Sequence, residues 1–433
     1  MKHTPTLALV FWIVVYAGPA FSEVWTLDKT VQAALDASSS AAIDRLDAAS
    51  STEDAVSART AWYPSVSVTG GINYVNRVME LNIPPRSIRF GDYDSYDFKM
   101  RVNQILYDGG RLSALQRAGL DRAEMHSRQA ESSELSAEFE AKTAFFSVAL
   151  AQENIKASEQ SIREAQNHQT DVLALREQGM ALEDDVLLSR LRISQAEMNR
   201  VTYEANLERA RAAFRKVAGI LPDAGISVNW TPGIQSDLPA ADTETAFHNR
   251  PEFKALDASL RAAGMTTESA RAGRLPTIGF NGAFNYGKPG LDQLKNKWMY
   301  YFTGGISLNW NLWDWGTVNR DVEKAEIARK KTEKTVEDLK LAVARQMTEA
   351  LAGYNEARQR VSLAEQSAEY AKRHLELVGA SFKNGVATER DYDTAHALYT
   401  KSLYDAAASR IAGEISRAQV EYVLGIRYRG EKP

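Results

Sequence analysis

The sequence contains no cysteine among its 433 residues. This absence excludes disulfide bonds, thiolate metal sites and an N-terminal cysteine modified with lipid. The formal net charge of −4 is small and gives no electrostatic footprint for nucleic acid. The sequence also lacks a Ser-His-Asp arrangement, a phosphate-binding loop and HExxH spacing. It therefore predicts no nucleic-acid partner, no cofactor and no enzymatic activity.

Long apolar runs are equally scarce, and the main one lies at the N-terminus. Residues 1–22 contain Lys2, an apolar run at 7–17, and small residues at positions 20 and 22. This order is typical of a secretory signal peptide, with cleavage expected before Glu23. A single membrane anchor is the alternative, but the run is shorter than the ~20 residues that span a bilayer. No comparable run follows, so the sequence predicts no membrane-spanning helix in the exported chain.

The rest of the chain repeats itself. Residues 108–219 align with residues 314–425 at a constant offset of 206 positions (314 − 108), without insertion. Residues 59–74 align with 271–286 at an offset of 212 (271 − 59), so the loop of the first copy is six residues longer. An internal duplication usually gives a symmetric architecture rather than a lone catalytic pocket. Residues shared by both copies include Asp108 and Asp314, Gly110 and Gly316, His168 and His374, Gly179 and Gly385, Asp185 and Asp391, and Gly219 and Gly425.

The duplication divides the chain into five expected parts. They are a signal peptide at 1–22, a first repeat at 23–220, a linker at 221–239, a second repeat at 240–426 and a tail at 427–433. The linker holds three prolines and two glycines, which favour turns and irregular structure. Each repeat is predicted to begin with a shorter helical stretch, about 27–62 or 241–274, followed by two strands, a long helix and a returning helix.

Four segments alternate apolar and polar side chains with the period of two that is typical of β-strands. Such strands also suit a soluble sandwich. The export signal, aromatic residues near the strand ends and lengths close to the ~9–11 residues of a transmembrane strand favour a membrane barrel instead. Four strands cannot close a barrel, and open edges are unfavourable in lipid, so several chains have to share one. The apolar positions are Val66, Val68, Ile72 and Tyr74; Phe98, Met100, Val102 and Leu106; Ile278, Phe280, Phe284 and Tyr286; and Ile306, Leu308, Trp310 and Leu312.

The helices that follow are too long for one globular domain. Asp108 and Asp314 are expected to cap helices that run without proline to Gly179 and Gly385. About 65 residues at ~1.5 Å each extend over roughly 100 Å. The two glycines are predicted left-handed C-caps, after which the chain turns back. The first returning helix carries a stripe with the spacing of a coiled-coil seam, formed by Leu187, Leu191, Ser194, Met198, Val201 and Ala205.

The signal peptide, the duplicated plan, the Tyr-Pro and Leu-Pro strand openings at 63–64 and 275–276, and the turns at 108–110 and 314–316 together resemble the TolC-like outer-membrane efflux protein family. The resemblance covers nearly the whole chain after residue 22. It implies a mixed α and β, mostly helical fold. Four strands from each chain of a homotrimer would form one outer-membrane β-barrel, continued by a long periplasmic α-helical coiled-coil barrel.

The resemblance also implies a function. Such a protein is the passive channel, or exit duct, of a tripartite efflux pump or a type I secretion system, and it is gated at the periplasmic helix tips. It works in the outer membrane with a periplasmic adaptor (membrane fusion) protein and an inner-membrane RND, ABC or MFS transporter. The alternative is an exported coiled-coil structural or adhesive protein without a pore, which would not need lipid-facing side chains on its strands.

The site residues implied by the resemblance lie at the two hairpin tips. Asp185 and Asp391 match acidic residues of the family's periplasmic entrance. The arginine that locks the entrance would fall at Ala387 and a second acidic residue at Thr394, so the pattern departs there. Arg390, Glu389 and Asp393 lie close by as substitutes. Adaptor tips would dock at Gly179, Met180, Ala181, Gly385, Val386 and Ala387.

Three further groups have two interpretations each. The tip carboxylates, with Glu183 and Asp184 among them, either line a cation-selective pore or simply suit helix N-termini. Lys99 and Arg101 either face the barrel lumen or snorkel at the membrane interface. His374 and His396, each eleven residues from Gly385, are level across a hairpin, but no third ligand accompanies them and no metal site is predicted.

Overall fold

The computed structural model describes residues 23–90, 92–222, 225–231, 238, 242–292, 296–428 and 430. The predicted signal peptide lies outside the described residues, as does much of the predicted linker. The chain divides into two compact units, one formed by residues 1–38, 134–242 and 346–433 and the other by residues 39–133 and 243–345. We call them the hairpin unit and the sheet unit. Each is described by itself.

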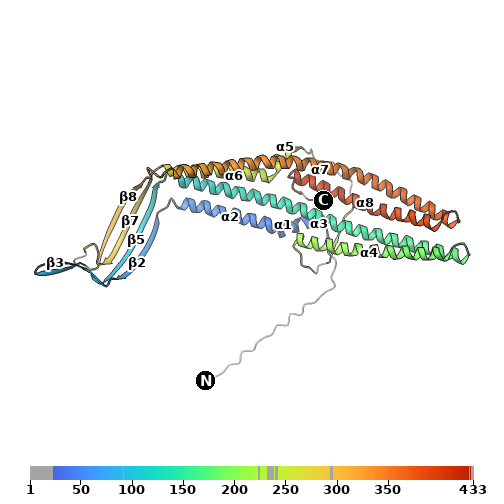
Figure 1. Ribbon diagram of the computed structural model, residues 1–433, viewed down its shortest axis with the longest axis horizontal. Helices are drawn as coiled ribbons and strands as arrows, with labels where there is room; N and C mark the ends of the chain where they lie inside the picture. Colours follow the sequence, from blue (N-terminus) through green and yellow to red (C-terminus); the bar gives the residue numbers. More distant parts are fainter. Residues whose placement is uncertain are drawn as a thin grey trace, which may run out of the picture. The chain divides into compact units, whose positions relative to one another are not determined.

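Two antiparallel helical hairpins dominate the hairpin unit (Figure 1). The first joins α3 (Arg111–Glu177) to α4 (Glu183–Ala218), and the second joins α7 (Thr317–Lys383) to α8 (Glu389–Val423). α3 and α7 contain 67 residues each, as the absence of proline predicts. At ~1.5 Å per residue each extends over roughly 100 Å. The predicted long outgoing and returning helices are therefore confirmed.

Left-handed glycines end both long helices at the hairpin tips. Gly179 has φ 75° and Gly385 has φ 71°. The next residue in each turn donates its backbone N–H to a carbonyl five positions earlier, Met180 to Leu175 and Val386 to Ser381, at 2.8 and 2.9 Å. This is the Schellman arrangement, which satisfies carbonyls left free at a helix C-terminus. The predicted C-caps are confirmed.

A hydrophobic core at the other end of the hairpin unit packs around α1 (Leu27–Ala37) and a short parallel pair of strands, β1 (Glu23–Trp25) and β6 (Ile226–Val228). The ring of Trp25 lies edge-on to Phe214 of α4, with centroids 5.3 Å apart. Sequence analysis missed both strands, because three-residue segments are too short to show a period of two.

Helix α8 contacts both helices of the first hairpin. On α3, Ser161 and Thr400 share a hydroxyl hydrogen bond of 3.1 Å, and Gln160 donates to Tyr399 at 2.7 Å. On α4, the ring of Tyr203 lies 4.8 Å from the ring of Tyr404. A charged pair, Lys142 and Glu421, adds a 2.6 Å contact with α3 nearer the core. The seam of α8 is thus buried between α3 and α4.

The predicted apolar stripe on α4, by contrast, is left largely uncovered by the described part of the chain. Leu187 and Leu191 are each 53% exposed, Met198 is 61% exposed and Val201 is 64% exposed. The first half of α4 instead buries a different set of side chains, Val186, Ser189, Arg192 and Ala196. The stripe therefore does not hold the α3–α4 hairpin together.

The sheet unit contains an antiparallel sheet in the order β2-β5-β7-β8. Its strands are β2 (Ser65–Tyr74), β5 (Asp94–Tyr107), β7 (Thr277–Lys288) and β8 (Met299–Asn309). The four predicted strands are present. However, β8 starts and ends earlier than predicted, so Trp310 and Leu312 follow it, and the indole of Trp310 donates to the backbone carbonyl of Arg274. The strand instead includes Tyr300 and Tyr301, aromatic residues whose position near a strand end is also typical of a membrane-interface girdle.

The strand register places most of the predicted apolar side chains on one face, whereas Leu106 lies at a register shift in β5. Val68, Met100, Phe284 and Phe302 form one row across all four strands. The first two are 74% and 44% exposed, and Phe302 is 76% exposed. Such exposure is unusual for large apolar side chains in a sheet that faces water. Among the described residues, no helix is long and apolar enough to cross a membrane.

The opposite face of the sheet is polar. Thr69, Lys99 and Asn285 are paired across β2, β5 and β7, and Arg101 lies on the same face two residues from Lys99. The ammonium of Lys99 lies 2.9 Å from Asp97. The structure thus places Lys99 and Arg101 on the face opposite the apolar rows.

The six extra residues of the first repeat contribute to a separate β-hairpin in the sheet unit. It joins β3 (Met79–Ile83) to β4 (Arg86–Phe90), which form a separate two-stranded sheet among the described strands. Sequence analysis treated this segment as a loop, because its alternation is short and Pro84 and Pro85 interrupt it.

Short helices precede each pair of strands in the sheet unit. They are α2 (Ser39–Thr60) in the first repeat, and α5 (Thr243–Asn249), α6 (Pro251–Arg271) and the 3₁₀ turn η1 (Ala272–Arg274) in the second. Asp108 accepts backbone N–H bonds from Gly110 and Leu112, at 3.0 and 2.7 Å. Asp314 accepts equivalent bonds ahead of α7, at 2.9 and 2.8 Å. Both aspartates therefore cap the long helices, as predicted.

Candidate functional site at the hairpin tips

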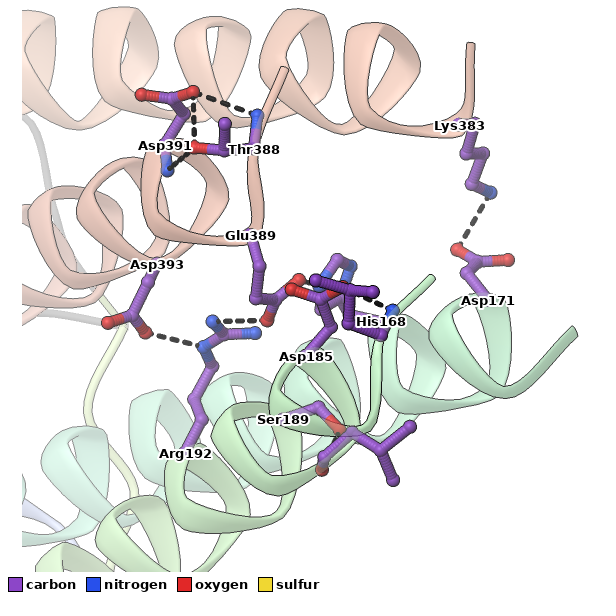
Figure 2. A network of polar contacts seen from close by, with 12 residues as sticks. His168, Asp171, Asp185, Ser189, Arg192, Lys383, Thr388, Glu389, Asp391 and Asp393 are labelled. Atoms are coloured by element: carbon purple, nitrogen blue, oxygen red, sulfur yellow. Dashed lines mark hydrogen bonds and ion pairs between the residues drawn. The ribbon is translucent and has the colours of Figure 1, made fainter. Parts of the chain in front are cut away.

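The predicted tip aspartates stabilise the starts of the returning helices (Figure 2). One carboxylate oxygen of Asp391 accepts hydrogen bonds from the backbone N–H of Thr388 at 2.8 Å and from its hydroxyl at 2.7 Å. In return, the N–H of Asp391 donates to the Thr388 hydroxyl at 3.3 Å. This reciprocal pattern is a capping box. The bonds from the Thr388 hydroxyl and backbone lower the pKa of Asp391 below its usual value.

Asp185 has the same position at the start of α4. Its carboxylate accepts the backbone N–H of Leu182 at 2.7 Å. Leu182 has no side-chain oxygen, so the backbone N–H of Asp185 has no side-chain acceptor of the kind that Thr388 provides at the other tip. A carboxylate in the first turn also interacts favourably with the helix dipole. The structure therefore gives both predicted tip aspartates a helix-capping position.

A buried charged network connects the two hairpins just inside the tips. Glu389 of α8 accepts from Arg192 of α4 at 2.8 Å and lies 2.7 Å from Nε2 of His168 on α3. Arg192 also donates through Nε to Asp393 at 2.8 Å. Glu389, Arg192 and His168 are only 3%, 5% and 3% exposed. We call these four residues, Glu389, Arg192, His168 and Asp393, the tip clamp (Figure 2).

Aromatic rings surround the tip clamp. The imidazole of His168 stacks on Tyr392, with centroids 3.5 Å apart and planes 6° from parallel. The guanidinium of Arg192 lies 5.1 Å from the centre of the same ring, a cation–π arrangement. The ring of Phe382 on α7 lies tilted beside His168, with centroids 5.0 Å apart. Burial raises the pKa of Tyr392 to about 12, so its hydroxyl stays protonated at neutral pH.

His396 lies one turn further along α8 and is 5% exposed. Burial, followed by the positive charge of Arg192, lowers the pKa of His396 from 6.5 to about 4. The imidazole is therefore neutral at physiological pH. Its Nε2 atom and Nη1 of Arg192 are buried without a hydrogen-bond partner in the described part of the chain. Burial of polar atoms without a hydrogen bond is unfavourable. The stability of the clamp region therefore depends on the protonation of His396.

Two exposed ion pairs lie closer to the turns. Lys383 of α7 is 2.8 Å from Asp171 of α3, so this pair also connects the hairpins. Arg176 pairs with Glu183 within the first hairpin. Exposed pairs of this type contribute about 0–1 kcal/mol. The buried clamp and the exposed Lys383–Asp171 pair thus connect the same two hairpins at different depths.

The structure brings together only some of the predicted gate residues. Asp393 belongs to the tip clamp, whereas Arg390 is exposed and outside it. Asp185 and Asp391 cap separate helices. His374 is exposed and His396 is buried, and nowhere in the described ranges do three or more possible metal ligands gather.

The predicted docking residues form the turns themselves. Met180 is 62% exposed and Val386 is 80% exposed, whereas Ala181 and Ala387 are half-buried against Val172 and Phe382. Gly179 and Gly385 are exposed, and a Cβ atom at either would meet no atom within 4 Å. Each tip thus presents exposed apolar surface beside an uncovered backbone, and at the first tip Leu182 adds to it with 73% exposure.

Sequence analysis missed Arg192 and the role of His168. His168 corresponds to His374 in the second repeat, so the alignment singles it out but does not indicate which residue it contacts. Arg192 corresponds to Leu398 at the offset of 206, so the repeat alignment did not single it out. An arginine and a glutamate 197 positions apart have no sequence signature that predicts their contact.

Comparison with known proteins agrees with this architecture. Outer membrane protein TolC of Vibrio cholerae is 24% identical over 390 residues, which cover 86% of this chain and 82% of that protein. Toxin and drug export protein A of Aggregatibacter actinomycetemcomitans is 22% identical over 279 residues, covering 61% of this chain but only 58% of that protein.

A solved structure of a membrane protein from Pseudomonas aeruginosa matches with a TM-score of 0.82 at 19% identity, over 98% of this chain and 97% of that one. The likeness to this structure is one of fold. The family described as Outer membrane efflux protein matches residues 31–220 and 243–425, which together make up most of the sequence. The chain therefore belongs to the outer membrane efflux protein family.

Proposed function

We propose that three copies of this protein assemble into a passive duct that is gated at its hairpin tips. As a member of its family the protein is an outer-membrane efflux protein, and members of the family are channels rather than enzymes. The observation that carries the proposal is the sheet. It has a continuous exposed apolar face, a polar opposite face and two open edge strands, β2 and β8.

The sheet supports a barrel shared between chains. Backbone groups on an open edge are strongly unfavourable in lipid, because no water satisfies them. Pairing β8 of one copy with β2 of the next removes both edges, and three copies supply twelve strands at four per chain. The apolar rows then face lipid, and Lys99 and Arg101 then face the lumen.

The tip clamp supports a gate at the periplasmic end. It connects α3, α4 and α8 through charged hydrogen bonds among the buried side chains of His168, Arg192 and Glu389. Asp393, whose side chain is 56% exposed, adds a further bond to Arg192. Opening the entrance requires the hairpins to separate, which exposes these charges or leaves them unpaired. Arg390, Asp185 and Asp391 lie at the same tips, and three copies would place at least three carboxylates of each kind around the opening, which favours cations.

The proposed partners follow from the family to which the chain belongs. A periplasmic adaptor protein would dock on the exposed tips, at Gly179, Met180, Ala181, Gly385, Val386 and Ala387. An inner-membrane transporter of the RND, ABC or MFS class would supply the energy, in a tripartite efflux pump or a type I secretion system. The name of one relative mentions the export of toxins and drugs, and we propose cargo of that range.

Single-channel conductance of the purified protein in a planar bilayer tests the function, after its oligomer size has been measured by light scattering. We expect a trimer that gives small, cation-selective steps. A protein that fails to insert would support the alternative of an exported coiled-coil protein without a pore. A correctly inserted trimer with large, unselective steps would contradict the gate while leaving the duct intact.

A further inference from the structure

The β3–β4 hairpin alternates apolar and polar residues although it lies outside the four-stranded sheet. Met79, Leu81 and Ile83 alternate along β3 with Glu80 and Asn82. The three apolar side chains are 76%, 46% and 54% exposed. Large apolar side chains that gather on an exposed surface commonly mark an interaction site. The hairpin thus has an apolar face that the described part of the chain leaves open.

The strand register places apolar positions of β4 on the same face. Residues directly opposite each other in an antiparallel pair lie on one face, and Met79 is opposite Phe90 as Leu81 is opposite Ile88. We call positions 79, 81, 83, 88 and 90 the hairpin face. Among the described strands, none lies between β7 and β8 in the second repeat. The hairpin face is therefore a feature of the first repeat alone.

Aromatic side chains mark the end of the sheet from which the hairpin extends (Figure 1). Tyr96, Tyr286 and Tyr300 lie on the apolar face of the sheet, in β5, β7 and β8. The ring of Trp298 stacks on Tyr286, with centroids 4.9 Å apart. Tyrosine and tryptophan concentrate where a membrane-spanning segment meets the lipid headgroups. In the proposed barrel, this end of the sheet therefore lies at a membrane–water interface.

The hairpin begins close to this aromatic end. The backbone N–H of Val75 donates to the carbonyl of Tyr93 at 2.8 Å, so the β2–β5 pairing continues one residue beyond Tyr74. Three residues separate Val75 from Met79, and the chain between them extends over at most about 14 Å. The base of the hairpin therefore lies near the level of the headgroups.

Two exposed arginines flank the hairpin face. Arg77 precedes β3, and Arg86 begins β4, where it lies opposite Ile83. Guanidinium groups bind phosphate oxygens through paired hydrogen bonds, and phosphate is common to the headgroups of membrane lipids. Apolar area combined with attraction to anionic lipid is what binds amphipathic segments to a membrane surface. The chemistry of the hairpin therefore favours lipid over a protein partner.

We infer that the hairpin face binds the lipid leaflet that surrounds this end of the sheet. The apolar positions contact acyl chains, and Arg77 and Arg86 contact headgroup phosphates. This inference rests on the proposed lipid-facing sheet and goes beyond it, because β3 and β4 are not strands of that sheet. The contact gives each chain a second attachment to lipid, outside the barrel wall.

Fluorescence from single labelled positions tests the inference, because the protein has no native cysteine. The full-length variants are Met79→Cys, Glu80→Cys, Leu81→Cys, Asn82→Cys and Ile83→Cys. Each is labelled with an NBD fluorophore and reconstituted into vesicles of phosphatidylethanolamine and phosphatidylglycerol, with or without a lipid that carries a nitroxide on its acyl chain. We expect blue-shifted emission and strong quenching by the nitroxide at 79, 81 and 83, and neither effect at 80 and 82.

Two positions in β8 report on the sheet in the same vesicles. Phe302→Cys labels the apolar face and should be quenched, whereas Thr303→Cys labels the opposite face and should not. Absence of quenching along β3, with Phe302→Cys quenched, would overturn the hairpin contact and leave the lipid-facing sheet intact. Equal quenching at all five β3 positions, or blue-shifted emission without quenching, would also overturn it, the latter by placing the hairpin face against protein. Absence of quenching at Phe302→Cys would overturn both proposals.

The arginines are tested with the label at position 81. Arg77→Gln/Arg86→Gln should reduce the quenching, because the hairpin then loses its attraction to phosphate. Arg77→Lys/Arg86→Lys keeps both charges and should retain most of it. Arg358→Gln removes one exposed charge from α7 and should have no effect. Unchanged quenching in Arg77→Gln/Arg86→Gln would overturn the assignment of the two arginines to headgroup phosphates.

Discussion

Glu389 of α8 lies 2.8 Å from Arg192 of α4, and the two residues are only 3% and 5% exposed although they are 197 positions apart in the sequence. Burial of a charged pair is unfavourable unless each group finds good partners. Here Glu389 has His168 as a second partner and Arg192 has Asp393. The contacts therefore fix how the second hairpin packs on the first, which is the geometry that a gate between hairpins has to control.

Replacing Glu389 with Gln should weaken this connection. The change leaves the buried guanidinium of Arg192 with one carboxylate, and loss of one partner in a buried pair typically costs about 3–5 kcal/mol. We expect a lower thermal midpoint and larger conductance steps, since the tips separate more easily. Glu177→Gln is the matched control, because Glu177 is exposed at the end of α3. Unchanged conductance together with an unchanged melting temperature would rule out a clamp at this position.

Two substitutions separate capping from pore charge at the second tip. Thr388→Ala removes the hydroxyl half of the capping box but keeps the carboxylate, whereas Asp391→Ala removes both the cap acceptor and the charge. Both should loosen the start of α8. Only Asp391→Ala should reduce cation selectivity, measured as the reversal potential in a salt gradient. Equal reversal potentials for the two variants would show that Asp391 acts in the helix start alone.

The cap also predicts a dependence on pH. Because hydrogen bonds from Thr388 lower the pKa of Asp391, the folded state favours the ionised carboxylate. The stabilisation is present above the unfolded pKa and is lost as the pH falls through the lower folded value. Hydrogen exchange at the N-terminus of α8 should therefore accelerate in that acidic range, and the acceleration should disappear in Asp391→Asn.

His396 predicts a second pH effect in a higher range. Its pKa falls from 6.5 to about 4, through burial and the charge of Arg192, with Asp393 raising it and His168 lowering it. In the unfolded chain, His396 therefore binds a proton as the pH falls below about 6.5. In the folded chain it binds that proton only at about pH 4. Stability should be complete above this window and should fall by on the order of 3 kcal/mol as the pH drops through it.

The test compares thermal midpoints from pH 4 to pH 7. His396→Asn should flatten the slope, whereas His248→Asn, at an exposed position on α5, should leave it intact. A wild-type midpoint that does not change between pH 6.5 and pH 4.5 would contradict a buried neutral imidazole.

Sequence patterns were most informative where one periodic feature extends over many residues. The absence of proline and the paired glycines predicted α3, α4, α7 and α8, and the period of two predicted β2, β5 and β7 closely. The β3–β4 hairpin and the β1–β6 pair were missed because short strands give few periods to count. At β8, aromatic residues at both ends left the boundaries ambiguous.

The candidate site was less predictable for a physical reason. Asp185 and Asp391 could be chosen because they correspond to each other in the two repeats and match acidic residues implied by the family resemblance. The tip clamp depends on which faces of three helices meet, and a single buried arginine on a long amphipathic helix resembles a solvated one. Arg192 also corresponds to Leu398 in the second repeat, so the repeat alignment does not mark the position as charged. Only the packed structure distinguishes a buried arginine from a solvated one.

The apolar face of the sheet predicts a sensitive position in β7. Phe280 pairs with Gln104 and Ile306 on this face and is 39% exposed. Phe280→Asp would place a carboxylate against lipid, so we expect the protein to be lost from the folded outer-membrane fraction. Thr303→Asp puts the same charge on the polar face of β8 and should assemble. Normal assembly of Phe280→Asp would contradict a lipid-facing sheet.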